Sequence, residues 1–217
     1  MEFKSILFDL DGTLTDPKVG ITKSVAHALK YFGIEVTDTD TLTPFIGPPL
    51  VVSFRDIYGF DEAQCLKAVE VYREYFSVTG KFENEVYPYT EPLLKLLQGK
   101  GIRLFVATSK PELFARQILE HFGLAHYFED IVGIAMDEEK VEKDVIVSRV
   151  IGRYSLDKSK TLMIGDRMFD IDGAHKNGIP CMAVGFGYGS REEFVRHGAD
   201  IIIDSNQQFY KYFEERL

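Results

Sequence analysis

The sequence predicts a three-layer α/β fold, in which helices cover both faces of a parallel β-sheet and a block of helices is inserted near the start. The apolar run Ile-Leu-Phe at residues 6–8 is short enough for a buried strand, and from about residue 86 onward short apolar runs alternate with segments of helical periodicity. Residues 15–85 between them contain no strand-like run. Alternation of strands and helices is typical of a parallel sheet with helices on both faces.

The expected elements follow in chain order. The first strand covers residues 6–8, and the inserted block has apolar residues near helical spacing. Three helices are expected in this block, at 18–33, 48–57 and 62–78. Beyond it, helices are expected at 91–99, 112–122, 142–153, 168–176, 190–197 and 206–215, and strands at 103–108, 131–134, 161–164, 180–184 and 200–203. The sequence therefore assigns residues 1–14 and 86–217 to an α/β core and residues 15–85 to an all-helical cap domain.

Composition narrows the classes of function. The chain has 217 residues, of which 45% are hydrophobic and 27% charged, as in an ordinary globular protein with a sizeable core. Its net charge of -9 argues against nucleic acid or an anionic membrane as the main partner. Cys65 and Cys181 lack metal-ligand spacing, which indicates reduced structural thiols. With no room for a signal peptide and no apolar run long enough to span a membrane, we expect a cytoplasmic protein, and we expect a monomer.

Two acidic residues directly follow the first strand. Asp9 and Asp11 are two residues apart, so at a strand end their side chains project to the same side. Gly12 then allows the chain to turn away. Two carboxylates held side by side at the end of a buried strand cost free energy unless a cation or a proton relieves them. The alternative is an Asp-Gly hairpin turn, but the following segment has helical rather than strand spacing.

A second acidic pair follows a later strand. Asp166 and Asp170 are four residues apart and share one face of the first turn of the expected helix. Capping of that helix is the alternative for Asp166, and it explains Asp170 less well. The carboxyl ends of parallel strands lie at one edge of a sheet, so we expect Asp9, Asp11, Asp166 and Asp170 to converge there. Oxygen ligands without nitrogen or sulfur neighbours select a hard cation, and magnesium is the ion that we expect.

Hydroxyl and amino groups complete the candidate site. Thr108 and Ser109 lie where a strand meets a helix, a position that suits a phosphate oxygen, although helix capping is the commoner role on this motif alone. A lysine at the same edge would neutralise a phosphate. Lys143 is preferred over Lys140 because it stands just before an apolar helical run, and a solvated position at the helix start is the alternative for either lysine.

With these positions in order, the chain resembles the haloacid dehalogenase superfamily of phosphohydrolases, whose core is a Rossmann-like parallel sheet. The resemblance covers nearly the whole chain. Its specific segments are Asp-Leu-Asp-Gly-Thr-Leu-Thr-Asp at 9–16 and Gly-Asp-Arg-Met-Phe-Asp at 165–170. Within the superfamily the chain resembles the phosphoglycolate phosphatase and 5′-nucleotidase-like branch, which carries a helical cap after the first motif. Two further stretches fit this branch, at 15–22 and 187–190.

The resemblance implies a role for each position. Asp9 is expected to be the nucleophile that forms an aspartyl-phosphate, and Asp11 to protonate the leaving oxygen and then to activate water. Magnesium is expected to be held by the Asp9 carboxylate, the Asp11 main-chain carbonyl and Asp166, with support from Asp170. The phosphoryl oxygens are expected to contact Thr108, the Ser109 amide and Lys143. The expected activity is therefore magnesium-dependent hydrolysis of a small phosphorylated metabolite, with phosphoglycolate or a nucleoside 5′-monophosphate as the leading candidates.

Two alternatives stay open at the level of sequence. The first is a sugar-phosphate mutase of the same superfamily, which usually has a cap histidine some ten residues beyond the second aspartate. Here that region contains no histidine, and the first histidine is His27, on the following helix. This argues against the mutase hypothesis. The second is a non-catalytic phosphate-binding protein, which the complete set of motif residues argues against. Arg55, Lys81 and the Gly-Pro-Pro loop at 47–49 are candidates to face the substrate, and the glycine-rich loop at 185–189 to border the site.

Overall fold

The structure is a computed structural model that describes residues 3–138 and 141–217. The chain divides into two compact units. The first comprises Met1–Asp16 and Val86–Leu217, and the second comprises Pro17–Glu85. The short strands β2 (Thr15–Asp16) and β3 (Glu85–Val86), where the chain passes from one unit to the other, pair in a small separate sheet.

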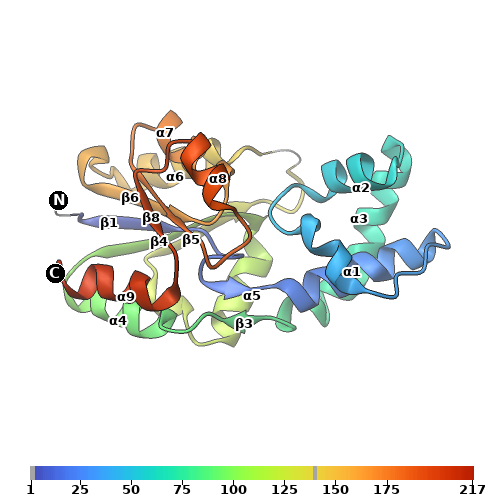
Figure 1. Ribbon diagram of the computed structural model, residues 1–217, viewed down its shortest axis with the longest axis horizontal. Helices are drawn as coiled ribbons and strands as arrows, with labels where there is room; N and C mark the ends of the chain where they lie inside the picture. Colours follow the sequence, from blue (N-terminus) through green and yellow to red (C-terminus); the bar gives the residue numbers. More distant parts are fainter. Residues whose placement is uncertain (1–2, 139–140) are drawn as a thin grey trace. The chain divides into compact units, whose positions relative to one another are not determined.

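A parallel sheet of six strands forms the centre of the first unit (Figure 1). Its order is β5-β4-β1-β6-β7-β8, and every neighbouring pair is parallel. The prediction of an α/β fold with a parallel sheet is therefore confirmed. The strands are β1 (Ser5–Phe8), β4 (Arg103–Pro111), β5 (Asp130–Ile134), β6 (Thr161–Gly165), β7 (Cys181–Val184) and β8 (Ile201–Ile203).

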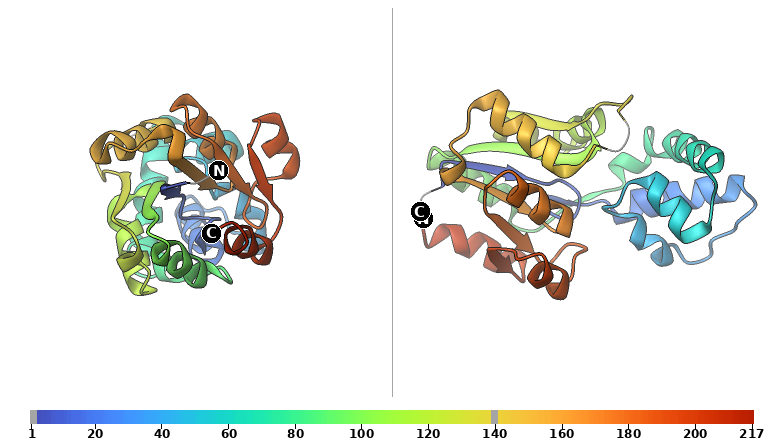
Figure 2. Two further views of the ribbon diagram at one scale, coloured as in Figure 1. Left: turned by 90° about the vertical axis from the view of Figure 1, so that its left-hand side faces the viewer. Right: turned by 90° about the horizontal axis from the view of Figure 1, so that it is seen from above.

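Helices cover both faces of this sheet (Figure 2). One face is covered by α4 (Thr90–Gly99), α5 (Glu112–His121) and α9 (Asn206–Glu214), and the other by α6 (Lys143–Tyr154), α7 (Met168–Lys176) and α8 (Arg191–Arg196). Successive side chains of a strand point to opposite faces, so Ile6 and Phe8 join the first layer and Leu7 joins the second. Burial on both faces explains why these strands read as continuous apolar runs.

The order of the strands places the carboxyl ends of β1 and β6 at a switch point. From β1 the chain builds outward through β4 and β5, then returns to the other side of β1 to form β6, β7 and β8. In open α/β sheets, ligands bind outside the carboxyl ends of the strands at such a point. Asp9 directly follows β1 and Asp166 directly follows β6. The topology therefore brings the two acidic segments to neighbouring positions.

The strand β4 is longer than expected. The prediction ended it at residue 108, but it continues to Pro111, with a register shift between Ala107 and Pro111. Pairing of Pro111 with Ile134 of β5, a contact distant in the sequence, extends the strand. The other helices and strands that were expected begin and end within about two residues of their expected positions. The sequence did not predict the short strands β2 and β3, the short 3₁₀ turns η3 (Ala125–Tyr127) and η4 (Lys158–Lys160), or the 3₁₀ helices of the second unit.

The second unit is helical. It contains α1 (Lys18–Tyr31), α2 (Leu50–Tyr58) and α3 (Glu62–Phe76), with the 3₁₀ helices η1 (Thr39–Phe45) and η2 (Gly80–Phe82). Aromatic rings fill part of its interior: the ring of Phe54 lies 4.9 Å from that of Phe45 and 5.9 Å from that of Phe60. In the described parts of the chain, no helix has both the length and the hydropathy that crossing a bilayer requires.

Candidate active site

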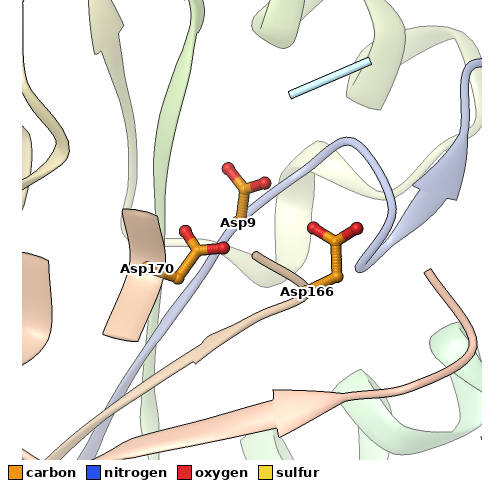
Figure 3. Close-up of side chains that lie close together, drawn as sticks. All are labelled: Asp9, Asp166 and Asp170. Atoms are coloured by element: carbon orange, nitrogen blue, oxygen red, sulfur yellow. The ribbon is translucent and has the colours of Figure 1, made fainter. Parts of the chain in front are cut away.

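Three buried carboxylates meet at the carboxyl ends of β1 and β6 (Figure 3). Asp9, Asp166 and Asp170 each place one carboxylate oxygen within 4.8 Å of the others. Asp9 is 9% exposed, Asp166 1% and Asp170 2%. Asp9 and Asp166 end adjacent parallel strands, and Asp170 lies in the first turn of α7, so three elements of the first unit supply the cluster. We refer to these three residues as the aspartate cluster.

Lys143 contacts the aspartate cluster from the start of α6. Its Nζ lies 2.6 Å from Asp9 Oδ1 and 2.8 Å from Asp170 Oδ1. The side chain is 4% exposed, so the two carboxylates take the place of water around the ammonium group. Gly173 of α7 allows the close approach, because a side chain there would press against Lys143 and the main chain of Asp144. Lys140, the alternative lysine, lies outside the described residues.

The aspartate cluster carries more negative charge than Lys143 can neutralise. Burial, together with Asp170 and Asp9, raises the pKa of Asp166 well above its ordinary value. Burial also raises the pKa of Asp170 to about 6, although Lys143 opposes this shift. Burial alone would lower the pKa of Lys143, but Asp170 and Asp9 raise it above its ordinary value. Three carboxylates facing one ammonium leave two negative charges, which two protons or one divalent cation can balance.

The donor set of the aspartate cluster fits a divalent cation. Asp166 Oδ2 accepts a hydrogen bond of 2.7 Å from the main-chain N–H of Tyr188. Asp166 Oδ1 is buried, and among the described residues it has no hydrogen-bond partner. A buried carboxylate oxygen without a partner costs free energy, which a bound cation would recover. All the groups are carboxylate oxygens, the ligands that hard cations such as magnesium prefer.

The carboxylate of Asp11 lies outside this cluster. Lys110 Nζ lies 2.6 Å from Asp11 Oδ2, and the two side chains are 6% and 16% exposed. Burial raises the pKa of Asp11 above its ordinary value, and Lys110 opposes the increase. The sequence led us to expect four converging carboxylates. The structure gathers three of them and gives the fourth a lysine of its own, because β1 ends at Phe8 and the side-chain alternation of a strand does not continue to Asp11.

Thr108 and Ser109 lie at the same edge of the sheet. Because β4 pairs in parallel with β1, with Val106 opposite Phe8, Thr108 falls level with the start of the first acidic segment. The Thr108 side chain is buried, and its Oγ1 accepts a hydrogen bond of 3.2 Å from the main-chain N–H of Lys110. Ser109 is exposed. The helix α5 is preceded by Pro111 and has no side-chain cap, so neither hydroxyl serves as its N-cap.

Helix capping involves Asp170 rather than Asp166. The Asp170 carboxylate accepts a hydrogen bond of 3.1 Å from the main-chain N–H of Arg167, the residue before α7. The sequence suggested the opposite assignment, with capping as the alternative for Asp166. Asp170 therefore has two contacts: one oxygen stabilises the start of α7, and the other pairs with Lys143. Asp166 Oδ1 has no hydrogen-bond partner within the described part of the chain, and the same is true of the buried Asp11 Oδ1.

Two residues at the site were not singled out from the sequence. Lys110 follows Thr108 and Ser109 in the same segment, and a lysine just beyond a buried strand was the available signal. Tyr188 lies in the glycine-rich loop at 185–189 that was expected to border the site, and its main-chain amide contacts Asp166. The residues expected to face the substrate, Arg55, Lys81 and the loop at 47–49, belong to the second unit, and their role stays a prediction.

Comparisons with known proteins agree with this geometry. Residues 6–184 match the family described as haloacid dehalogenase-like hydrolase. A 5′-nucleotidase from Pseudomonas aeruginosa is 47% identical over 197 residues, covering 91% of this chain and 89% of the relative. A phosphoglycolate phosphatase from Vibrio parahaemolyticus is 26% identical over 212 residues, covering 94% of this chain and 93% of the relative.

A different activity is named for another relative. The tyrosine-protein kinase PtkA from Mycobacterium tuberculosis is 38% identical over 190 residues, which is 88% of this chain but only 64% of the length of that kinase. Among solved structures, a predicted phosphatase from Clostridium acetobutylicum superposes with a TM-score of 0.94 at 44% identity, covering 99% of this chain and 100% of that one.

Proposed function

The chain belongs to the haloacid dehalogenase-like hydrolase family and is a phosphatase acting on phosphate esters, and we propose that it is a magnesium-dependent phosphomonoesterase for a nucleoside 5′-monophosphate. The observation that carries this proposal is the aspartate cluster with Lys143. It combines a candidate nucleophile, Asp9, with an uncompensated charge that suits a divalent cation. Phosphoryl transfer depends mainly on positioning and on charge stabilisation, which this arrangement supplies.

Asp9 is the proposed nucleophile. Its Oδ1 accepts from Lys143, which fixes the orientation of the carboxylate and leaves Oδ2 to attack phosphorus. In the first step the bond from Asp9 to phosphorus forms and the bond to the leaving oxygen breaks, giving an aspartyl-phosphate. In the second step water attacks phosphorus, and the carboxylate of Asp9 is released together with inorganic phosphate. Splitting one difficult displacement into two easier steps is the general advantage of a covalent intermediate.

Asp11 is the proposed acid and base. It would give its proton to the leaving oxygen in the first step and take a proton from water in the second. Its carboxylate is separate from the aspartate cluster and has Lys110 as its partner, so its environment differs from that of Asp9. Burial raises the pKa of Asp11, which favours the protonated form that the first step needs.

The remaining residues would hold the phosphoryl group and the metal. Thr108, the Ser109 amide and Lys143 are proposed to contact phosphoryl oxygens. Asp9, Asp166 and the main-chain carbonyl of Asp11 would hold magnesium, with Asp170 in support. When bound, magnesium supplies positive charge that stabilises the charge developing on the transferring group.

The substrate is proposed from the comparisons. The relative named 5′-nucleotidase is 47% identical to this chain, against 26% for the phosphoglycolate phosphatase, so a nucleoside 5′-monophosphate is the first candidate and phosphoglycolate the second. The second unit, inserted between Asp16 and Val86, is proposed to select among substrates. Arg55 and Lys81 are its candidate contacts. The protein is proposed to act in the cytoplasm as a monomer.

The proposal is tested by phosphate release. Wild type and Asp9→Asn are compared on nucleoside 5′-monophosphates, phosphoglycolate, sugar phosphates and phosphotyrosine, with magnesium and after its removal. We expect turnover of a nucleoside 5′-monophosphate by wild type with magnesium only, and a loss of at least about 1000-fold in Asp9→Asn. Equal rates in all conditions would contradict the mechanism, and preference for another ester would contradict the choice of substrate.

Assays of the same protein preparation also test two further activities, those of a mutase and of a kinase. A mutase would transfer the phosphoryl group to a sugar phosphate faster than to water. His27 does not favour this reaction, because it is exposed and pairs with Glu74 at 3.6 Å within the second unit. The kinase name of one relative suggests incubation with ATP and a tyrosine peptide. Phosphopeptide formed faster than free phosphate would favour a kinase over a phosphatase.

A further inference from the structure

The loop that follows β7, residues 185–190, packs against Asp166. The main-chain N–H of Tyr188 donates a hydrogen bond of 2.7 Å to Asp166 Oδ2. The hydroxyl of Tyr188 donates a hydrogen bond to Asp16 Oδ1. All of these residues belong to the first unit, and Asp16 is the last residue before the chain enters the second. Tyr188 therefore connects a proposed metal ligand with the end of β2.

Glycines let this loop approach Asp166 closely. A side chain at Gly187 would collide with the Asp166 side chain and with the main-chain carbonyl of Gly12. A side chain at Gly189 would collide with the main-chain carbonyl of Asp166 and with the ring of Phe194. A side chain at Gly12, where φ is +83°, would collide with the Asp166 carboxylate. Main chain thus encloses Asp166 on more than one side, and the loop determines how its carboxylate is oriented.

This contact holds one oxygen of Asp166 and leaves the other available. Oδ2 accepts from Tyr188, whereas Oδ1 is buried and has no hydrogen-bond partner in the described part of the chain. Without a cation, the buried carboxylate would be more stable if the loop donated hydrogen bonds to both of its oxygens. The observed arrangement instead suits a carboxylate held in one orientation for a cation. Mutation of groups that hydrogen-bond to metal ligands and orient them typically lowers metal affinity by about 10- to 100-fold.

We propose that Tyr188 is a positioning residue for the divalent-cation site. Its hydroxyl bond to Asp16 fixes the loop, and its amide in turn fixes Asp166 so that Oδ1 stays available to the cation. Tyr188 does not contact the reacting atoms in this scheme and acts through Asp166. This inference rests on the proposed function, because it requires Asp166 to be a magnesium ligand.

The test measures magnesium binding without substrate. Isothermal titration calorimetry of the metal-free full chain compares wild type with Tyr188→Phe, which removes only the hydroxyl, and with Asp16→Ala, which removes the acceptor. We expect each variant to bind magnesium about 10-fold more weakly. The double variant is expected to bind as weakly as either single variant, because both changes break the same bond. In phosphate-release assays, activity lost at low magnesium is expected to return at high magnesium.

A matched control removes the same kind of bond elsewhere in the first unit. The Tyr127 hydroxyl donates to Glu91 at 3.2 Å, away from the aspartate cluster. Tyr127→Phe is expected to bind magnesium as wild type does. Asp166→Asn is expected to lose binding. Circular dichroism reports whether each variant is folded, and Asp16→Ala, which keeps the whole tyrosine, carries the test if Tyr188→Phe does not fold.

The outcomes separate this inference from the proposed function. Binding by wild type that is lost in Asp166→Asn but stays within about twofold in Tyr188→Phe and Asp16→Ala would overturn the inference and leave the proposed function standing. Additive losses in the double variant would also overturn it, because the two residues would then act separately. Absence of magnesium binding by wild type would overturn both.

Discussion

Separate lysines hold the two aspartates of the first acidic segment. Lys143 pairs with Asp9 at 2.6 Å, and Lys110 pairs with Asp11 at 2.6 Å. Both pairs are largely buried, so removing either lysine leaves a carboxylate without its partner in a poorly solvated place. Each carboxylate therefore has its own lysine partner, so the proposed nucleophile and the proposed acid and base lie in different electrostatic environments.

Replacement of Lys110 by methionine should change the pH dependence of turnover. Lys110 lowers the pKa of Asp11 while burial raises it, so without the lysine that pKa rises further. The water step needs ionised Asp11. The acid limb of the pH–rate profile is therefore expected to move to higher pH, and turnover near neutral pH to fall about 10- to 100-fold. Steady-state kinetics between about pH 5 and pH 9 check this. Lys158→Met, at an exposed lysine, is the control, and an unmoved acid limb would contradict the role of Lys110.

Magnesium binding should compete with protons. Burial raises the pKa of Asp166 well above its ordinary value and that of Asp170 to about 6. When folding raises the pKa of a carboxyl, the stability of the metal-free protein falls as the pH rises through the interval between two pKa values. These are the pKa in the unfolded state, about 4, and the raised pKa in the folded state. Magnesium requires the ionised form. Its effect on the melting temperature is thus expected to be largest near neutral pH and to shrink toward about pH 5. Thermal unfolding with and without magnesium measures the difference, and an effect constant with pH would exclude this competition.

At the scale of elements, Asp130 joins two helices to the edge of the sheet. It begins β5 and accepts hydrogen bonds from Arg153 at 2.7 Å and Tyr154 at 3.0 Å, both in α6. Arg116 of α5 lies 3.4 Å away and also donates to the main-chain carbonyl of Ile131. Helices on opposite faces of the sheet therefore meet at one carboxylate.

Asp130→Asn should destabilise the fold in a pH-dependent way. Burial alone would raise the pKa of Asp130, but bonds from Arg153, Tyr154 and other donors outweigh it and lower that pKa. Its contribution is therefore present above the unfolded pKa of about 4 and is lost as pH falls through the folded value. We expect a loss of about 1–3 kcal/mol near neutral pH and a smaller loss in acid, measured by urea unfolding. Asp56→Asn, at an exposed pair, should change stability by less than about 0.5 kcal/mol, and an equal loss for both would contradict the prediction.

Two glycines within helices are expected to change the free energy of unfolding in opposite directions when each is replaced by alanine. Gly20 of α1 lies against the main chain of Gly80, so a methyl group there would collide with a carbonyl oxygen. Gly152 of α6 has open space around it. Gly20→Ala is expected to lower the free energy of unfolding by about 1–3 kcal/mol, and Gly152→Ala to raise it by about 0.5–1 kcal/mol. Urea unfolding of both variants decides, and stabilisation by Gly20→Ala would show that α1 does not need this close approach.

The sequence predicted most elements because each is encoded locally, as the run at residues 6–8 and the helix after Lys143 show. Contacts distant in the sequence could not be predicted. Pairing of Pro111 with Ile134 lengthened β4, and the partner of Lys110 became known only with the structure. The contact of Tyr188 with Asp166 uses a main-chain amide, so this partner could not be predicted, although the glycines at 185–189 marked the loop as a candidate to border the site.

At the scale of the whole molecule, the first unit contains the complete aspartate cluster and both lysines. Every strand of the six-stranded sheet also comes from this unit. The ends left by removal of the second unit lie close together, because the main-chain N–H of Tyr87 donates to the carbonyl of Leu14 at 3.1 Å. The second unit is therefore a separable insertion in the chain.

Replacement of residues 17–85 by a short glycine-serine linker should preserve the metal site. We expect a folded core by circular dichroism and magnesium affinity within about threefold of wild type by calorimetry, because every proposed ligand remains. Preference among phosphate esters is expected to weaken in phosphate-release assays, since the proposed selecting unit is gone. A folded core that no longer binds magnesium would show that the insertion contributes to the metal site.

The order of the strands also determines when the sheet can assemble during translation. The central strand β1 leaves the ribosome first, yet its neighbours begin only at Arg103 and Thr161. Pairing between such distant segments is slow, so Leu7 and Phe8 stay unpaired until those strands have been synthesised. A nascent chain that already carries Asp9 still lacks Asp166 and Asp170. Chains that end before Asp170 are therefore expected to lack activity.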